Sequence, residues 1–196
     1  MGVQDYLQGV CTLTLTGVAV WGISAWRREF IGKRRTELAE EVLALFYECR
    51  DIVHQMRNPF IYEGEDDDCR RSEPGEAAGR AADTGILTWR YMQRAATFAK
   101  LQSLRYRCMA LFGKQVAESF DELAKLVREL LLAERAHTDL LSEATDVTGV
   151  SRRELAPEIQ RVSAFLGRGA GAEDTVPLRL DNLVDQIEKI CSKHIR

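Results

Sequence analysis

The chain has 196 residues, of which 45% are hydrophobic and 29% charged, and a formal net charge of −3. So small a net charge argues against a dedicated nucleic-acid binder, and five cysteines without a CxxC pair are typical of free thiols in a reducing compartment. The length allows one ordinary domain with its own core, beside shorter segments.

Residues 7–26 contain no charged side chain, and a helix of twenty residues is about 30 Å long, the thickness of a bilayer's hydrocarbon core. Tyr6 stands before one end, and Trp21 and Trp26 lie at the other, where amphipathic rings suit the membrane interface. We therefore expect a transmembrane helix over 7–26, preceded by a short extracytoplasmic segment over 1–6.

Charge predicts the orientation of this helix. Only Asp5 and the N-terminal amine precede it, whereas five basic residues follow it closely: Arg27, Arg28, Lys33, Arg34 and Arg35. A cleaved signal peptide has the opposite order, with basic residues ahead of the apolar core. Under the positive-inside rule, we expect a single-pass protein of a bacterial inner membrane with its N-terminus outside and the rest of the chain in the cytoplasm.

A long juxtamembrane helix is expected over 27–58. Its apolar residues recur at steps of four and three, which is the spacing of a coiled-coil seam: Leu38, Val42, Leu45, Cys49, Ile52 and Met56. Ile31 extends the register towards the membrane, so the anchor and this helix are predicted to form one rod. Asn58-Pro59 is the predicted end, because a residue before proline avoids the helical region.

The string AEEVLALFYECRDIVHQMRNPF, residues 39–60, resembles a segment of a group of uncharacterised bacterial proteins with one N-terminal span and a helical cytoplasmic part. The resemblance covers about a tenth of the chain. It implies a membrane location and a helical fold, and it carries over no functional residue.

Residues 59–85 lose this periodicity and are rich in acidic residues, proline and glycine, so we expect a flexible acidic loop. A calcium site is the alternative. The string EGEDDD lacks the alternating ligands, the central glycine and the terminal glutamate of an EF-hand loop, which favours the loop without a metal.

A helical hairpin is expected over 86–145. Its first helix, 86–112, is unusually basic and offers a candidate binding face for anionic lipid or nucleic acid: Arg90, Arg94, Lys100, Arg105 and Arg107. The alternative is that these residues face acidic positions of the preceding helix: Glu37, Glu40, Glu41, Glu48 and Asp51.

Gly113 is the predicted stop of the basic helix, and Ser119 with Glu122 has the spacing of a capping box at the start of the next helix. A register at steps of four and three then continues from Val116 to Ala144, and it is apolar apart from Glu134 and His137. We expect antiparallel pairing of the two helices, with a continuous bent rod through Gly113 as the alternative.

The last segment, 146–196, is expected to hold a short helix, a Gly/Ala linker over 167–177 and an amphipathic helix over about 180–193. Ser151 with Glu154 is a second predicted capping box, and the short helix is expected to end near Leu166.

Few residues point to chemistry. Glu134 and His137, with Asp51 and His54, have the Glu-x-x-His type of spacing found in dinuclear metal sites of helical bundles, but the basic helix offers no carboxylate. Glu134 and His137 are better interpreted as polar residues at a seam edge that specify register. We find no catalytic constellation and predict no metal, no cofactor and no enzyme activity.

Together these patterns predict an all-α protein, with an N-terminal transmembrane helix followed by an antiparallel helical bundle or coiled coil. The expected function is a scaffold that holds the bundle at the membrane, with the lipid bilayer as one partner and a second copy or another protein bound through the seam. Binding of anionic lipid or nucleic acid by the basic helix is the alternative, and a metal site in the bundle is the third.

Overall fold

The computed structural model describes residues 3–60, 62, 65, 85–146, 150–168 and 174–195. Within the helices, the side chains of residues 3–14, 16, 20, 24, 25, 145, 146 and 150–152 lie outside the description. The described residues form five helices and no strand, which confirms the all-α prediction. Most of the predicted acidic loop, 59–85, lies outside the described residues, so the prediction of a flexible segment stays untested.

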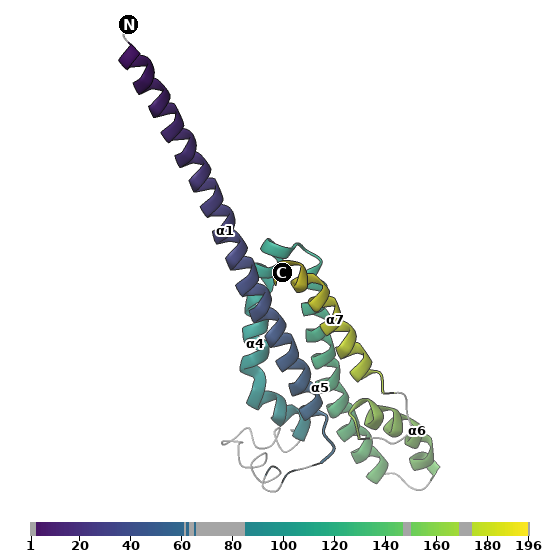
Figure 1. Cartoon of the computed structure of the whole chain (residues 1–196). Helices are drawn as coiled ribbons and strands as arrows, with labels where there is room; N and C mark the ends of the chain where they lie inside the picture. Colours follow the sequence, from purple (N-terminus) through teal and green to yellow (C-terminus); the bar gives the residue numbers. More distant parts are fainter. Residues whose placement is uncertain are drawn as a thin grey trace.

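One uninterrupted helix, α1, extends over Val3–Met56, and its 54 residues make a rod about 80 Å long. The predicted continuation through Gly32 and the predicted end before Asn58-Pro59 are both confirmed. Figure 1 shows that the C-terminal part of α1 belongs to a bundle, whereas its N-terminal part extends away from the other helices. The molecule is therefore a bundle with a long helical extension.

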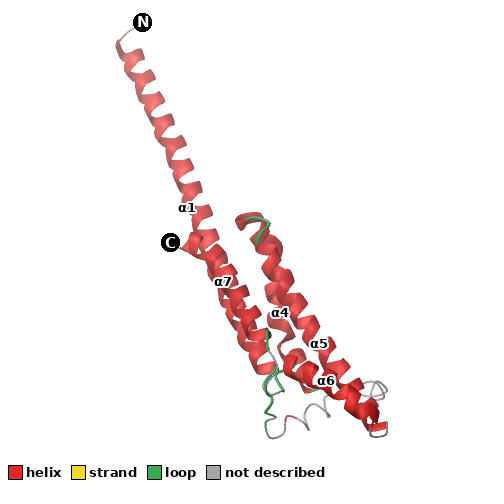
Figure 2. Ribbon diagram, turned by 90° about the vertical axis from the view of Figure 1, so that its right-hand side faces the viewer, coloured by secondary structure: helices red, strands yellow, loops and turns green. Residues whose placement is uncertain are grey.

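Four helices surround the core: α1, α4 (Ile86–Phe112), α5 (Val116–Asp146) and α7 (Val176–Ile195). Helix α4 packs between α1 and α5, and α7 closes the ring on the other side. Figures 1 and 2 show that helices that follow one another round the ring are antiparallel. Helix α6 (Val150–Phe165) packs on α5. The predicted hairpin 86–145 and the predicted bundle are thus present, whereas a coiled coil finds no support.

The core contains most of the predicted seam residues, although Leu141 of the predicted α5 seam is 45% exposed and Leu126, which lies outside that predicted seam, is fully buried. On α1 the buried face begins at Leu38 and includes Leu45, and on α5 it includes Phe120 and Leu130. The rings of Phe46 and Phe120 meet edge to face, with their centroids 5.1 Å apart, near the middle of the core. Leu45 and Leu130 are 5% and 0% exposed, so the apolar seam is filled by the chain's own helices.

Gly113 separates α4 from α5, as predicted. Its φ of 94° is a conformation that glycine adopts easily, and its N–H donates to the Met109 carbonyl at 3.1 Å, as at many helix ends. The alternative of a continuous rod is excluded. The predicted range of α4 agrees with the structure, and the last helix is longer than predicted at both ends.

The first predicted capping box is wrong. Helix α5 begins at Val116 instead of after Ser119, because a turn at Lys114 starts it earlier: the Ala117 N–H donates to the Lys114 carbonyl at 3.1 Å. Ser119 is buried, and its hydroxyl donates to Gln186 Oε1 at 3.4 Å. The second box is also misplaced, because α6 already begins at Val150; the side chain of Ser151 lies outside the described residues.

In the part of the chain that the structure describes, no helix is both long and apolar enough to cross a membrane. Over the predicted span, 7–26, the backbone is helical, but the side chains of most of these residues lie outside the description. The prediction of a transmembrane helix therefore receives no support from the structure.

Replacing Phe120 with Ala should lower the free energy of unfolding by about 3–5 kcal/mol, because it leaves a cavity beside the buried Phe46 ring. Leu132→Ala is the matched control on the same helix, since Leu132 is 57% exposed and should change stability by less than about 0.5 kcal/mol. Urea denaturation of both variants checks this, and equal losses would contradict the assigned core.

Candidate functional site

The extension of α1 carries large apolar side chains that are mostly exposed. Five of them are each 65% exposed or more: Leu15, Val18, Trp21, Ile23 and Trp26. A Cβ atom placed on Gly17, Gly22 or Gly32 would meet nothing within 4 Å. The exposed residues lie on several sides of the helix rather than along one stripe, a pattern typical of a helix with an apolar environment all round.

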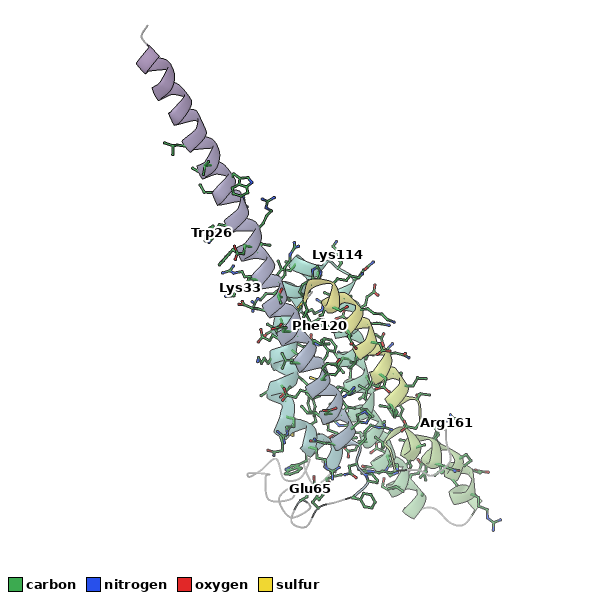
Figure 3. The ribbon with its side chains drawn as sticks, viewed as in Figure 1. Trp26, Lys33, Glu65, Lys114, Phe120 and Arg161 are labelled. Carbon is green, nitrogen blue, oxygen red and sulfur yellow. The ribbon has the colours of Figure 1, made fainter. Side chains whose placement is uncertain are left out.

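A basic collar separates this apolar part from the bundle. We give that name to Arg27, Arg28, Lys33, Arg34 and Arg35, which are all exposed. The indole of Trp26 stacks on Phe30 with ring centroids 5.6 Å apart, and the Arg34 guanidinium lies over the same Phe30 ring at 4.6 Å. In Figure 3 Trp26 lies on the extension and Lys33 lies on α1 near the end of the bundle. The structure thus places the predicted membrane-interface residues in succession along one helix, from its extension to the start of the bundle.

The bundle begins where the C-terminus of α7 meets α1. The Thr36 hydroxyl lies 2.8 Å from the His194 carbonyl oxygen and 3.2 Å from that of Gly32. The His194 ring also stacks on Phe112 at the end of α4, with centroids 4.9 Å apart. The ends of α4 and α7 therefore hold α1 immediately after the basic collar.

The five predicted basic residues of α4 do not act together. Arg90 and Arg107 are separated by about 25 Å along the helix. Lys100 lies 3.4 Å from Glu41 of α1, as the alternative interpretation expects, but Arg105 pairs with Asp121 of α5 at 2.7 Å. Arg94 and Arg107 are exposed.

Arg90 is buried and closes the far end of α1. Its guanidinium donates to the carbonyl oxygens of Gln55, Met56, Asn58 and Phe60 at 2.7–3.3 Å. It also donates to both carboxylate oxygens of Glu65, at 2.5 and 2.7 Å. The Arg90 hydrogen bond lowers the pKa of Glu65 below its ordinary 4.5, although burial opposes the shift. Arg90 is therefore a cap for the free carbonyls at the C-terminus of α1.

Arg57, like Arg90, joins segments that are distant in sequence, and we call the hydrogen bonds of these two arginines clasps. Its guanidinium donates to the carbonyl oxygens of Ala164 and Phe165, and it lies 2.7 Å from Asp174 Oδ1. Gly167 makes this approach possible, since its φ is +78° and a Cβ there would lie 2.7 Å from the Arg57 carbonyl oxygen. The end of α1 is thereby joined to the end of α6.

Glu134 caps α4 from a neighbouring helix. It is 2% exposed and accepts hydrogen bonds from the N–H groups of Leu87 and Thr88 at 2.9 and 2.7 Å and from the Thr88 hydroxyl at 2.6 Å. Arg168 lies 3.3 Å from the same carboxylate. A Cβ atom on Gly85 would clash with the Glu134 carboxyl group. The sequence interpretation placed Glu134 at a seam edge, but its buried carboxylate has a specific role at a helix start.

His137, one turn after Glu134, does not join it in a ligand set. Its Nε2 lies 2.8 Å from the Ser163 hydroxyl of α6. Burial lowers the pKa of His137, and the nearby Arg168 lowers it further. His54, the other histidine considered for a metal site, is exposed. Among the described residues, no three His, Cys, Asp or Glu side chains are grouped so that they could hold a metal ion.

Three cysteine thiols lie inside the bundle. Cys49, Cys108 and Cys191 are fully buried, and burial raises the pKa of these thiols to about 12, 12 and 11. At neutral pH they are therefore protonated and shielded from solvent.

No protein-family model, curated protein or solved structure matches the chain.

Arg90→Ala should destabilise the bundle by about 3–5 kcal/mol, because it leaves a buried Glu65 carboxylate and several carbonyls without donors. Arg94→Ala is the control one turn further along α4, where the exposed side chain should contribute less than about 0.5 kcal/mol. Urea denaturation separates the two. An Arg90→Ala variant with the same free energy of unfolding as the natural chain would show that the hydrogen bonds of Arg90 do not hold the end of α1 in the bundle.

The Glu65–Arg90 pair should also give stability a dependence on acidic pH. Because the pKa of Glu65 is lowered on folding, the pair contributes fully above 4.5 and its contribution is lost as the pH falls through the folded pKa. Glu65→Gln should therefore be less stable than the natural chain at neutral pH, and the two unfolding free energies should converge below that range. Parallel curves from pH 7 to pH 3 would contradict this role.

Proposed function

We propose that the protein is a membrane-anchored helical scaffold, in which the apolar part of α1 lies in a bilayer and the bundle stands at its cytoplasmic face. The observation that supports this most is the exposure of Leu15, Val18, Trp21, Ile23 and Trp26 on a helix that leaves the bundle. Each of these side chains is at least 65% exposed, and the apolar interior of a bilayer would bury that surface.

Burying these five exposed side chains would release a large free energy. Burying a side chain of this size is worth about 1.5–3 kcal/mol, so the five together represent roughly 10 kcal/mol. That is comparable with the whole stability of a typical domain. A soluble chain would gain from folding this segment onto the bundle, but the core there is already complete without it, since its first buried α1 residue is Leu38.

The basic collar supports the proposed orientation. Its residues lie between the apolar segment and the bundle, whereas the only charged side chain before the segment is Asp5. The positive-inside rule then favours a bundle on the cytoplasmic side of a bacterial inner membrane and an N-terminus outside. The resemblance of residues 39–60 to bacterial single-pass proteins points the same way.

A scaffold role agrees with the interior of the bundle. The predicted seam is occupied by the chain's own helices, so a partner protein or second copy would bind the outer faces instead. The clasps at Arg57 and Arg90 fix the far end of the rod-shaped bundle. Such a construction holds a surface at a set distance from the membrane.

Carbonate extraction tests the anchor. The full chain should stay in the membrane pellet, and a version that starts at Arg27 should be soluble and helical, because it keeps the whole buried core from Leu38 onwards. Protease added on the periplasmic side should spare the bundle. Release of the full chain by carbonate would overturn the proposal.

A charge inside the segment gives a sharper version of the same test. Leu15→Arg and Val18→Arg together should impair insertion, since each arginine near the centre of a span costs about 2.5–3.5 kcal/mol. Glu40→Arg is the control, because it adds an arginine at an exposed position of the same helix below the basic collar. Equal extraction of both proteins would contradict a role of residues 15 and 18 in the bilayer.

A further inference from the structure

A groove lies where α1 leaves the bundle. It has a volume of about 520 Å³ and is formed by α1 on one side and the end of α4 on the other. Its apolar wall includes Phe30, Ile31 and Leu111, and Phe30 and Ile31 are 44% and 39% exposed. Four charged side chains complete the lining: Arg34, Glu37, Glu41 and Arg107.

The two arginines and two glutamates of the groove balance in formal charge, but they differ in their ion pairs. Glu37 lies 4.0 Å from Lys33, and Glu41 lies 3.4 Å from Lys100, so each carboxylate has a cation outside the groove lining. Arg34 lies over the Phe30 ring, and neither Arg34 nor Arg107 forms an ion pair with a described residue. The groove therefore combines an apolar wall with two guanidinium groups that make no ion pair in the described part of the chain.

The groove also lies at the depth of lipid headgroups if α1 is anchored as proposed. Phe30 is one turn beyond Trp26, or about 6 Å along the helix, and Arg34 is about 12 Å beyond it. The headgroup layer on each side of a bilayer is several ångströms thick and begins where the hydrocarbon core ends. Phe30 and Ile31 therefore lie within the headgroup layer, close to where the acyl chains begin. The Arg34 guanidinium reaches back to the same level, because it lies 4.6 Å over the Phe30 ring.

We infer that this groove binds an anionic phospholipid, with its phosphate between Arg34 and Arg107 and the start of an acyl chain against Phe30, Ile31 and Leu111. The inference rests on the proposed membrane anchor. Arg34 belongs to the basic collar, which membrane topology already explains, but Arg107 comes from α4, far from the anchor in sequence. Its presence in the same groove is what points to a bound headgroup.

The test uses the full chain in bilayer nanodiscs of phosphatidylcholine that contain a small share of phosphatidylglycerol with a photoreactive group at the start of its acyl chain. Cross-links should map to the peptides around Phe30, Ile31 and Leu111. Arg107→Ala should lower the yield about fivefold, because one basic residue near an anionic lipid surface contributes about 1 kcal/mol. Arg107→Lys should keep most of the yield.

Arg135→Ala is the control, because it removes an exposed arginine near the other end of α5 and should leave the yield unchanged. Unlabelled phosphatidylglycerol should compete with the probe, and phosphatidylcholine or inorganic phosphate should not. Equal labelling of the Arg107→Ala and control proteins, or competition by inorganic phosphate, would overturn a specific anionic lipid site.

Carbonate extraction of the same samples distinguishes the lipid site from the membrane anchor. A protein that stays anchored but shows no selective labelling refutes the groove alone, whereas a protein that carbonate extracts refutes the anchor and the groove together.

Discussion

The organisation of the molecule depends on one constraint, which is the continuity of α1. The C-terminal part of this helix packs in the bundle, and its N-terminal part extends outside the bundle. Its buried face begins at Leu38, and the described side chains before that residue are exposed, except for the half-buried Thr36. Because the backbone is helical from Val3 to Met56, the direction of the extension is fixed by the bundle. The apolar segment, the basic collar and the α1 side of the groove beside Arg107 therefore belong to one continuous helix.

Polar contacts fix the opposite end of the bundle. Arg90, Arg57 and Glu134 are each buried, and each satisfies backbone groups at the end of a helix to which it does not belong. Free carbonyls and N–H groups at helix ends are costly when buried, so these side chains decide which helix ends meet. The apolar core supplies most of the driving force for folding, whereas the clasps select one arrangement of the helices.

Local patterns in the sequence predicted a large part of this fold. The spacing of apolar residues located α1, α4 and α5, and Gly113 and Pro59 marked helix ends, because these signals act within a few residues. The capping box at Ser119 failed because a turn at Lys114 started the helix earlier and left the serine for a contact with Gln186. The basic face of α4 shows the same limit: Lys100 pairs with Glu41 and Arg105 with Asp121, partners that helical periodicity alone does not choose.

Site residues that lie close together in the sequence could be predicted from it, whereas those brought together by packing could not. The basic collar and the tryptophans follow directly from the sequence, but Arg107 joins Arg34 only through the packing of α4 against α1. The role of Arg90 had one available signal, since a helix that ends before Asn58-Pro59 leaves carbonyls that need donors. Which arginine supplies them depends on tertiary structure.

The central claim is that lipid surrounds the extension of α1 on all sides. Nitroxide labels placed one at a time from Leu15 to Phe30, in the full chain reconstituted in vesicles, measure it through their accessibility to oxygen and to a water-soluble paramagnetic reagent. The account predicts that labels from Leu15 to Ile23 favour oxygen whatever side of the helix they occupy, with a change towards the aqueous reagent after Trp26. An alternation with the helical period, which places one side of α1 in water or against protein, would contradict it.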